Sequence, residues 1–155
     1  MLAFFDTNVA VYADDGAFPE KQRIAANLIA EHYRNGTGVV STQVMQEYYN
    51  AATRKLRLEP ELAVRRLRFF ARMQVVNATP QLILEATDVH RLNRISFWDA
   101  MIVQSAKISG CNTLYSEDLN AGQSIIGVTI VNPFAGVAQW SVHEPLPRTE
   151  LPGRR

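Results

Sequence analysis

The chain has 155 residues, a length that matches one domain of ordinary size with a single hydrophobic core. Hydrophobic residues make up 47% and charged residues 20% of it, which excludes a disordered or fibrous protein. No apolar run approaches the roughly 20 residues needed to span a bilayer, and Asp6 interrupts the hydrophobic N-terminal stretch, so we expect a cytoplasmic protein without a membrane segment. The single cysteine, Cys111, excludes an internal disulfide and a cysteine-rich zinc site.

Short apolar strands alternate along the chain with helices. The pattern predicts, in chain order, a strand at 2–5, a helix at 19–35, a strand at 38–40, helices beginning at 42 and 60, a strand at 75–76, helices at 80–92 and 97–109, and strands at 112–115 and 128–131. This alternation implies an α/β fold, a three-layer α/β/α sandwich with a mainly parallel central sheet and right-handed crossovers.

The pattern changes after Phe134. We therefore expect one domain over residues 1–134, followed by a C-terminal extension at 135–155 that is extended or flexible. The reason is its content of chain-breaking residues, which are Pro145, Pro147, Pro152 and Gly153.

Four acidic residues are placed where the carboxyl ends of the parallel strands would meet. Asp6 ends the first strand, Glu47 lies in the helix after the second, and Asp99 lies in the first turn of the helix at 97–109. Asp118 follows the strand at 112–115. Ligands of open α/β sheets collect at this edge. Carboxylates held close together repel one another, and a divalent cation removes that penalty.

Oxygen ligands favour Mg²⁺ or Mn²⁺, and the chain has no His/Cys spacing typical of zinc. Each acid also has a purely structural interpretation. Asp6 could be the N-cap of a short helix beginning at Thr7, and Ser96 to Asp99 fits a capping box. Glu47 could belong to a solvated helix face, and residues 116–118 could be a polar turn. The joint placement of the four acids is what favours a metal site.

Four segments carry a resemblance to a known family. They are Phe4-Phe5-Asp6-Thr7-Asn8, the ten residues from Ser41 to Asn50, Ser96-Phe97-Trp98-Asp99-Ala100, and Leu114-Tyr115-Ser116-Glu117-Asp118-Leu119. In order and spacing they resemble the four motifs of PIN-domain nucleases. The likeness is greatest to the VapC-type toxins of bacterial toxin–antitoxin pairs and covers about residues 1–134.

The resemblance implies that Asp6, Glu47, Asp99 and Asp118 form the catalytic metal site. It implies that Asn8 and Ser116 support the site by hydrogen bonding. The expected activity is hydrolysis of RNA phosphodiesters with Mg²⁺ or Mn²⁺, since the chain shows no Ser/His or Cys/His nucleophile pattern. The resemblance also implies a homodimer and a cognate antitoxin that blocks the metal site.

A basic segment could hold the RNA, because an acidic site repels a polyanion. Residues 54–72 contain seven Lys and Arg residues and two Glu. Arg54 is placed on the helical stripe of Glu47, and Arg65 and Arg68 lie further along the segment. For each of them, a place on a solvated helix face is the alternative.

Two other functions compete with the nuclease. A phosphoacceptor receiver domain also builds an acidic magnesium pocket on an α/β sheet, but it needs paired acids directly after the first strand, and Asp14-Asp15 come too late. A non-catalytic PIN scaffold would bind RNA or protein without cutting it.

Overall fold

Six strands form one sheet in the computed structural model, which describes residues 1–137. They are β1 (Ala3–Phe5), β2 (Gly38–Ser41), β3 (Gln74–Val76), β4 (Thr113–Tyr115), β5 (Ser124–Ile125) and β6 (Val128–Val131). Their order across the sheet is β3-β2-β1-β4-β6-β5. All neighbours are parallel except β5, which runs antiparallel to β6. The predicted, mainly parallel sheet is confirmed.

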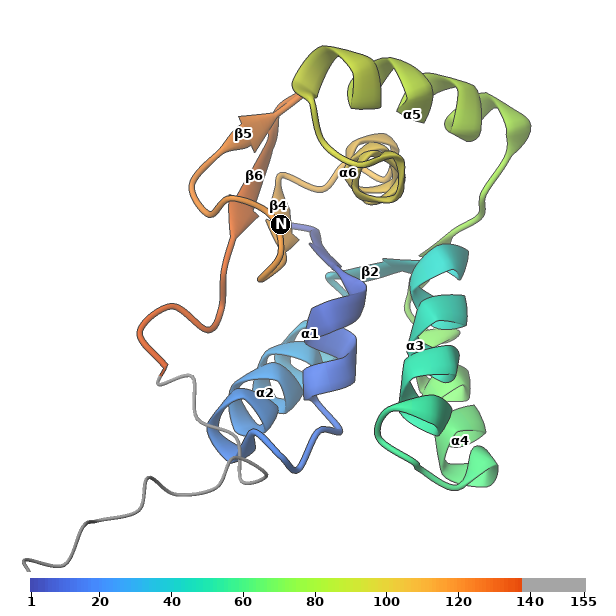
Figure 1. Cartoon of the computed structure of the whole chain (residues 1–155), viewed down its shortest axis with the longest axis vertical. Coiled ribbons are helices and arrows are strands. Elements are labelled where there is room, and N and C mark those ends of the chain that lie inside the picture. Colours follow the sequence, from blue (N-terminus) through green and yellow to red (C-terminus); the bar gives the residue numbers. More distant parts are fainter. Residues whose placement is uncertain (138–155) are drawn as a thin grey trace, which may run out of the picture.

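The helices cover both faces of this sheet. They are α1 (Thr7–Tyr12), α2 (Pro19–Asn35), α3 (Thr42–Arg54), α4 (Pro60–Phe70), α5 (Pro80–Asn93) and α6 (Phe97–Ile108). Figure 1 shows α1 to α4 on one side of the sheet and α5 and α6 on the other. This is the arrangement that right-handed crossovers produce when the strand order changes direction after β3. The expected three-layer sandwich is therefore present.

Local signals explain where the helices begin and end. Proline occupies the first turn of α2, α4 and α5, where its missing N–H has no helical partner to lose. The side chains of Ser41 and Ser96 cap α3 and α6 by accepting a backbone N–H. Helix α2 ends at Gly36, which has a left-handed φ of 66°. Because such signals are local, the predicted helix bounds agree with the observed ones to within about two residues.

Strand β5 is the element that the sequence did not predict. It forms a hairpin with β6, and the two residues between them, Ile126 and Gly127, have φ values of 46° and 87°. Two-residue hairpin turns need positive φ, which Asn or Gly adopts readily and a β-branched residue rarely does. Gly127 suits such a turn, but Ile126 does not, so the sequence carries only half of the usual hairpin signal.

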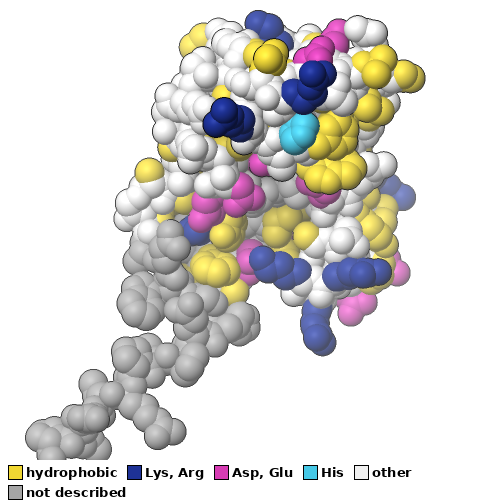
Figure 2. All heavy atoms as spheres, turned by 45° about the horizontal axis from the view of Figure 1, so that its top comes forward, with side chains coloured by type: hydrophobic (Ala, Val, Ile, Leu, Met, Phe, Trp, Pro, Cys, Tyr) yellow, Lys and Arg dark blue, Asp and Glu magenta, His cyan; other side chains and the backbone are white. Residues whose placement is uncertain are grey.

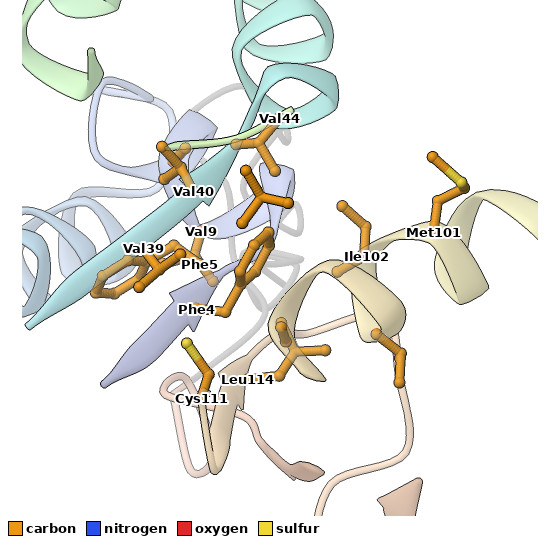
Figure 3. Close-up of a cluster of buried hydrophobic side chains, with 14 of the residues drawn as sticks. Phe4, Phe5, Val9, Val39, Val40, Val44, Met101, Ile102, Cys111 and Leu114 are labelled. Carbon is orange, nitrogen blue, oxygen red and sulfur yellow. The ribbon is translucent and has the colours of Figure 1, made fainter. Parts of the chain in front are cut away.

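The core forms where β1, β2 and β4 meet the first turns of α1 and α3 and the buried face of α6. Figure 3 shows Phe4, Val39 and Leu114 from the strands beside Val9 of α1 and Ile102 of α6. All five side chains are buried. Strand β1 is buried along its whole length, as expected of a central parallel strand, and burial of this kind is the main favourable term in folding.

The order in which the chain adds strands to the sheet reverses between β1 and β4. The chain passes from β1 towards β2 on one side, while β4 pairs with β1 on the other side. A hydrogen bond of 3.0 Å from the Asp6 N–H to the Tyr115 carbonyl joins the carboxyl ends of the two strands. Open α/β sheets bind ligands at such a switch point. The residues directly after β1 and β4 are therefore the first place to look for a site.

The end of the described chain packs back on the domain. The ring of Phe134 is buried and lies 5.0 Å from the ring of Tyr12 in α1. The expectation of an extended or flexible tail falls largely on residues 138–155, which lie outside the described residues. Within residues 1–137, no helix is both long enough and apolar enough to cross a membrane.

Candidate active site

Asp6 directly follows β1 and is the N-cap of α1, which confirms its structural interpretation, while its role as a metal ligand stays a prediction. Its Oδ1 accepts the Thr7 N–H at 2.7 Å. Its Oδ2 accepts the Ser116 hydroxyl at 2.7 Å and the Asn8 amide at 3.3 Å. The residue is only 6% exposed. Three donors thus hold the carboxylate in one orientation at the switch point.

Asn8 connects the start of α1 with the loop after β4. Its Nδ2 lies 3.3 Å from the Ser116 hydroxyl and 3.1 Å from Oδ2 of Asp118. Its Oδ1 accepts the Glu117 N–H at 3.1 Å. One amide side chain therefore contacts two of the four predicted acids, and Ser116 contacts one. Their role in orienting metal ligands stays a prediction.

Glu47 extends from α3 towards α1. Its Oε2 accepts the Thr7 hydroxyl at 2.6 Å, and its Oε1 accepts the Gln43 amide at 2.9 Å. The same Gln43 amide lies 3.3 Å from the Trp98 carbonyl oxygen at the start of α6. These contacts join α1, α3 and α6. Thr7 and Gln43 were not predicted as residues of the site, although the spacing of four residues between Gln43 and Glu47 places those two on one helix face.

Asp99 completes the set from the first turn of α6. Its N–H donates to the Ser96 hydroxyl at 3.0 Å, which confirms the predicted cap. All four predicted acids line a single cleft with a volume of about 370 Å³. Figure 2 shows acidic side chains gathered around a hollow in the surface. The other lining residues are Thr7, Asn8, Val11, Tyr12, Asp15, Gln43, Ala51, Lys55, Trp98, Ile102 and Glu117.

An ion pair that the sequence analysis did not anticipate lies at one wall of this cleft. The ammonium group of Lys21, on α2, lies 2.6 Å from Oε1 of Glu117, and its side chain is 5% exposed. It also lies 4.7 Å from the centre of the Tyr12 ring. Burial lowers the pKa of Lys21, but the hydrogen bonds to Glu117 and Tyr12 outweigh that effect and raise it. The pair ties α2 to the loop that carries Asp118.

The cleft holds more acceptors than donors. Burial raises the pKa of Asp6 to about 6, the hydrogen bonds from Ser116 and Thr7 oppose this, and the charges of Asp99 and Asp118 raise it further. Oε1 of Gln43 and Oε2 of Glu117 are buried without a hydrogen-bond partner in the described part of the chain. Within that part, however, no three His, Cys, Asp or Glu side chains are already arranged to hold a metal ion.

The three arginines predicted to bind RNA do not line the acidic cleft. Arg54 and Arg68 are exposed and do not line the cleft. Arg65 lines a separate cavity of about 280 Å³ together with Arg66, which forms an ion pair with Asp14. In place of Arg54, Lys55 lines the acidic cleft, because residues 43, 47, 51 and 55 of α3 and its C-cap follow one another at intervals of one turn along its wall.

Asp6→Asn should stabilise the metal-free protein at neutral pH. The folded pKa of Asp6, about 6, lies above its ordinary value of 3.8, so the contribution of this group to stability is present below pH 3.8 and is lost as pH rises through 6. Urea unfolding in EDTA should give the variant an advantage on the order of 2–3 kcal/mol at pH 7 and almost none at pH 3.5. Equal or lower stability of the variant at pH 7 would show that its hydrogen bonds matter more than its desolvation.

Solved structures with the same fold come from bacterial toxin–antitoxin systems. The VapC20 toxin of Mycobacterium tuberculosis, described as cleaving the sarcin–ricin loop, is 20% identical over 74% of this chain and 88% of its own, with a TM-score of 0.59. VapBC2 of Rickettsia felis, bound to promoter DNA, is 18% identical over 84% and 97%, with a TM-score of 0.61. A toxin–antitoxin complex of Klebsiella pneumoniae is 16% identical over the same shares, with a TM-score of 0.64.

At these identities, the likeness concerns the fold. Among curated proteins, none matches the chain. The sequence model of the PIN domain matches residues 3–123, which include all four acids of the cleft. Because this match spans well over half of the 155 residues, the chain belongs to the PIN domain family.

Proposed function

We propose that this protein is a metal-dependent endoribonuclease that hydrolyses RNA phosphodiesters and acts as the toxin of a type II toxin–antitoxin pair. The observation that carries the proposal is that Asp6, Glu47, Asp99 and Asp118, from four separate segments, line one cleft at the switch point of the sheet. Membership of a different family sets aside the receiver-domain alternative.

The residues of the cleft fit a hydrated Mg²⁺ or Mn²⁺ ion. Their carboxylates offer oxygen ligands, and within residues 1–137 the lining residues Gln43 and Glu117 each have a buried oxygen without a hydrogen-bond donor. Mg²⁺ usually keeps several waters and contacts one or two carboxylates directly, so a cleft whose acids do not already surround one point still suits it. We propose Asp6, Asp99 and Asp118 as the groups that hold the ion, with Glu47 reaching it directly or through water.

Each of the chain's own groups has a separate task in this scheme. The cation, when bound, would promote ionisation of the attacking water and neutralise charge developing on the phosphate. Asn8 and Ser116 hold the carboxylates of Asp6 and Asp118 in place through the hydrogen bonds described above. Thr7 and Gln43 do the same for Glu47. Lys55, at the wall of the cleft, would contact a neighbouring phosphate of the RNA.

The partner proteins belong to the same proposal. The Rickettsia and Klebsiella structures contain a toxin with its antitoxin, which supports a cognate antitoxin for this chain. We extend the proposal to a homodimer in the cytoplasm. Co-expression with the product of the adjacent reading frame should yield a copurifying complex without nuclease activity, and a neighbouring protein that neither binds nor inhibits the chain would contradict the toxin assignment.

RNA cleavage should require both the cation and the cleft carboxylates. We expect Mg²⁺ or Mn²⁺ to support cleavage, EDTA to abolish it, and Asp6→Asn or Asp118→Asn to reduce it by more than about 100-fold, because each removes a charged ligand. Asp88→Asn is the matched control, since Asp88 is an exposed acid of α5 outside the cleft. Gel assays on purified protein measure this.

Undiminished cleavage by Asp6→Asn would rule out the proposed site. If the wild-type protein neither binds Mn²⁺ in calorimetry nor cuts RNA, the non-catalytic scaffold is the better description. Binding of Mn²⁺ by the wild-type protein and its loss in Asp118→Asn would support the site independently of activity.

Lys55→Gln should weaken RNA binding more than Arg54→Gln does. Both changes remove one positive charge near the end of α3, but only Lys55 lines the cleft. Loss of one phosphate contact should lower the slope of log K against log salt by about 0.7 for single-stranded RNA. Fluorescence anisotropy at several salt concentrations measures the slope. A larger effect of Arg54→Gln would restore Arg54, the residue predicted from the sequence, as the main contact.

A further inference from the structure

A large aromatic side chain stands exposed at the acidic cleft. Trp98 lines the cleft and is 63% exposed, although it directly precedes Asp99 on α6. Leaving an indole ring in water is costly, since its full burial would remove a large apolar area. Tyr12, another aromatic residue of the cleft, is already engaged with Lys21 and Phe134. Trp98 is therefore the aromatic surface in the cleft that is open to a ligand.

The backbone that carries this ring is held firmly. The Ser96 hydroxyl caps α6 two residues earlier, and the Trp98 carbonyl oxygen accepts the Gln43 amide at 3.3 Å. The ring of Phe97, which packs against the core, lies 5.2 Å from the Trp98 ring at 65°. Because Trp98 and Asp99 both line the cleft, a ligand that fills the cleft lies close to both of them.

The composition of the cleft indicates what such a ligand is. Its carboxylates suit a cation that binds phosphate, and Lys55 at the wall suits a second phosphate. In a nucleotide, the ribose joins a planar, uncharged base to the phosphate. This base is the group that would meet an exposed indole. Base–aromatic stacking contributes about 1–3 kcal/mol per base. Bases inside an RNA duplex have both faces covered by their neighbours, whereas unpaired bases do not.

We propose that Trp98 stacks on an unpaired base next to the cleaved phosphodiester. This inference rests on the proposed ribonuclease function. It makes Trp98 a specificity-determining residue, while the carboxylates of the cleft remain the groups that act on the phosphate.

Kinetics of substituted proteins provide the first test. Trp98→Ala should lower kcat/KM on a single-stranded oligoribonucleotide by about 10- to 100-fold and lower it much less on the same sequence in a duplex. Trp98→Phe, which keeps an aromatic face, should retain most of the activity. Leu92→Ala is the matched control, because Leu92 is 82% exposed on α5 and lies outside the cleft. Mn²⁺ affinity and the unfolding midpoint should stay unchanged in all three variants.

Fluorescence provides a second test that leaves the cleft intact. The chain has two tryptophans, so Trp140→Phe makes Trp98 the only one. A six-nucleotide RNA, added in Ca²⁺ to limit cleavage, should quench the Trp98 emission. The same RNA with abasic sugars in place of its bases should quench it much less, because it retains the phosphates and lacks the stacking surface.

The outcomes separate this inference from the proposed function. If the wild-type protein cuts RNA but Trp98→Ala cuts it equally well and RNA does not quench Trp98, the inference is wrong and the ribonuclease stands. If RNA quenches Trp98 but no cation supports cleavage, the ring contacts a base, but the catalytic proposal fails and with it the role of Trp98 in the choice of a cleavage site. If Trp98→Ala instead dissociates a dimer in sedimentation, with RNA affinity unchanged, the ring is a protein interface and the inference is overturned.

Discussion

Burial of the Asp6 carboxylate at the carboxyl end of β1 is the constraint around which the site is arranged. Removing this charge from water raises its pKa to about 6, and Asp99 and Asp118 add repulsion. The Thr7 N–H and the Ser116 hydroxyl recover part of that cost by donating to it. The ionised Asp6 carboxylate therefore stays unfavourable, and a proton or a cation would stabilise it. The fold thus maintains a local electrostatic cost that binding of a divalent ion would relieve.

The same carboxylate shows how the sheet positions the rest of the cleft. The backbone N–H of Asp6 donates to the Tyr115 carbonyl at the end of β4, which places the loop at 116–118 beside Asp6. The Glu47 side chain extends from α3 and accepts a hydrogen bond from the Thr7 hydroxyl of α1. The Gln43 amide donates to Glu47 and to the Trp98 carbonyl oxygen, which connects this network to α6. Three helices and two strand ends are therefore linked by polar contacts at one edge of the sheet. Such networks fix side-chain orientation when their members are satisfied.

The walls of the cleft differ from its acidic centre. Lys21 is buried against Glu117 and holds the loop that carries Asp118, so its charge is used within the protein. Lys55 and Trp98 line the cleft with a cation and an exposed ring. A site for RNA would use three kinds of group. Acids would hold a metal ion, a cation would contact a phosphate, and an aromatic ring would contact a base. This division supports the ribonuclease proposal more strongly than the acids alone.

The sequence by itself determined all the helices and strands except β5, and it predicted the four acids that line the cleft. Proline, glycine and serine signals act within a few residues, and apolar runs identify strands buried on both faces, so the order of helices and parallel strands could be predicted. The rule that ligands collect at strand ends then located Asp6, Glu47, Asp99 and Asp118. Only the tertiary structure decided that Lys55 rather than Arg54 lines the cleft, that Lys21 pairs with Glu117, and that Thr7 and Gln43 hold Glu47. These contacts join residues far apart in the chain, and their geometry depends on how whole helices pack. The β5 hairpin was also missed, because Ile126 adopts a positive φ that its side chain disfavours and that the surrounding sheet imposes.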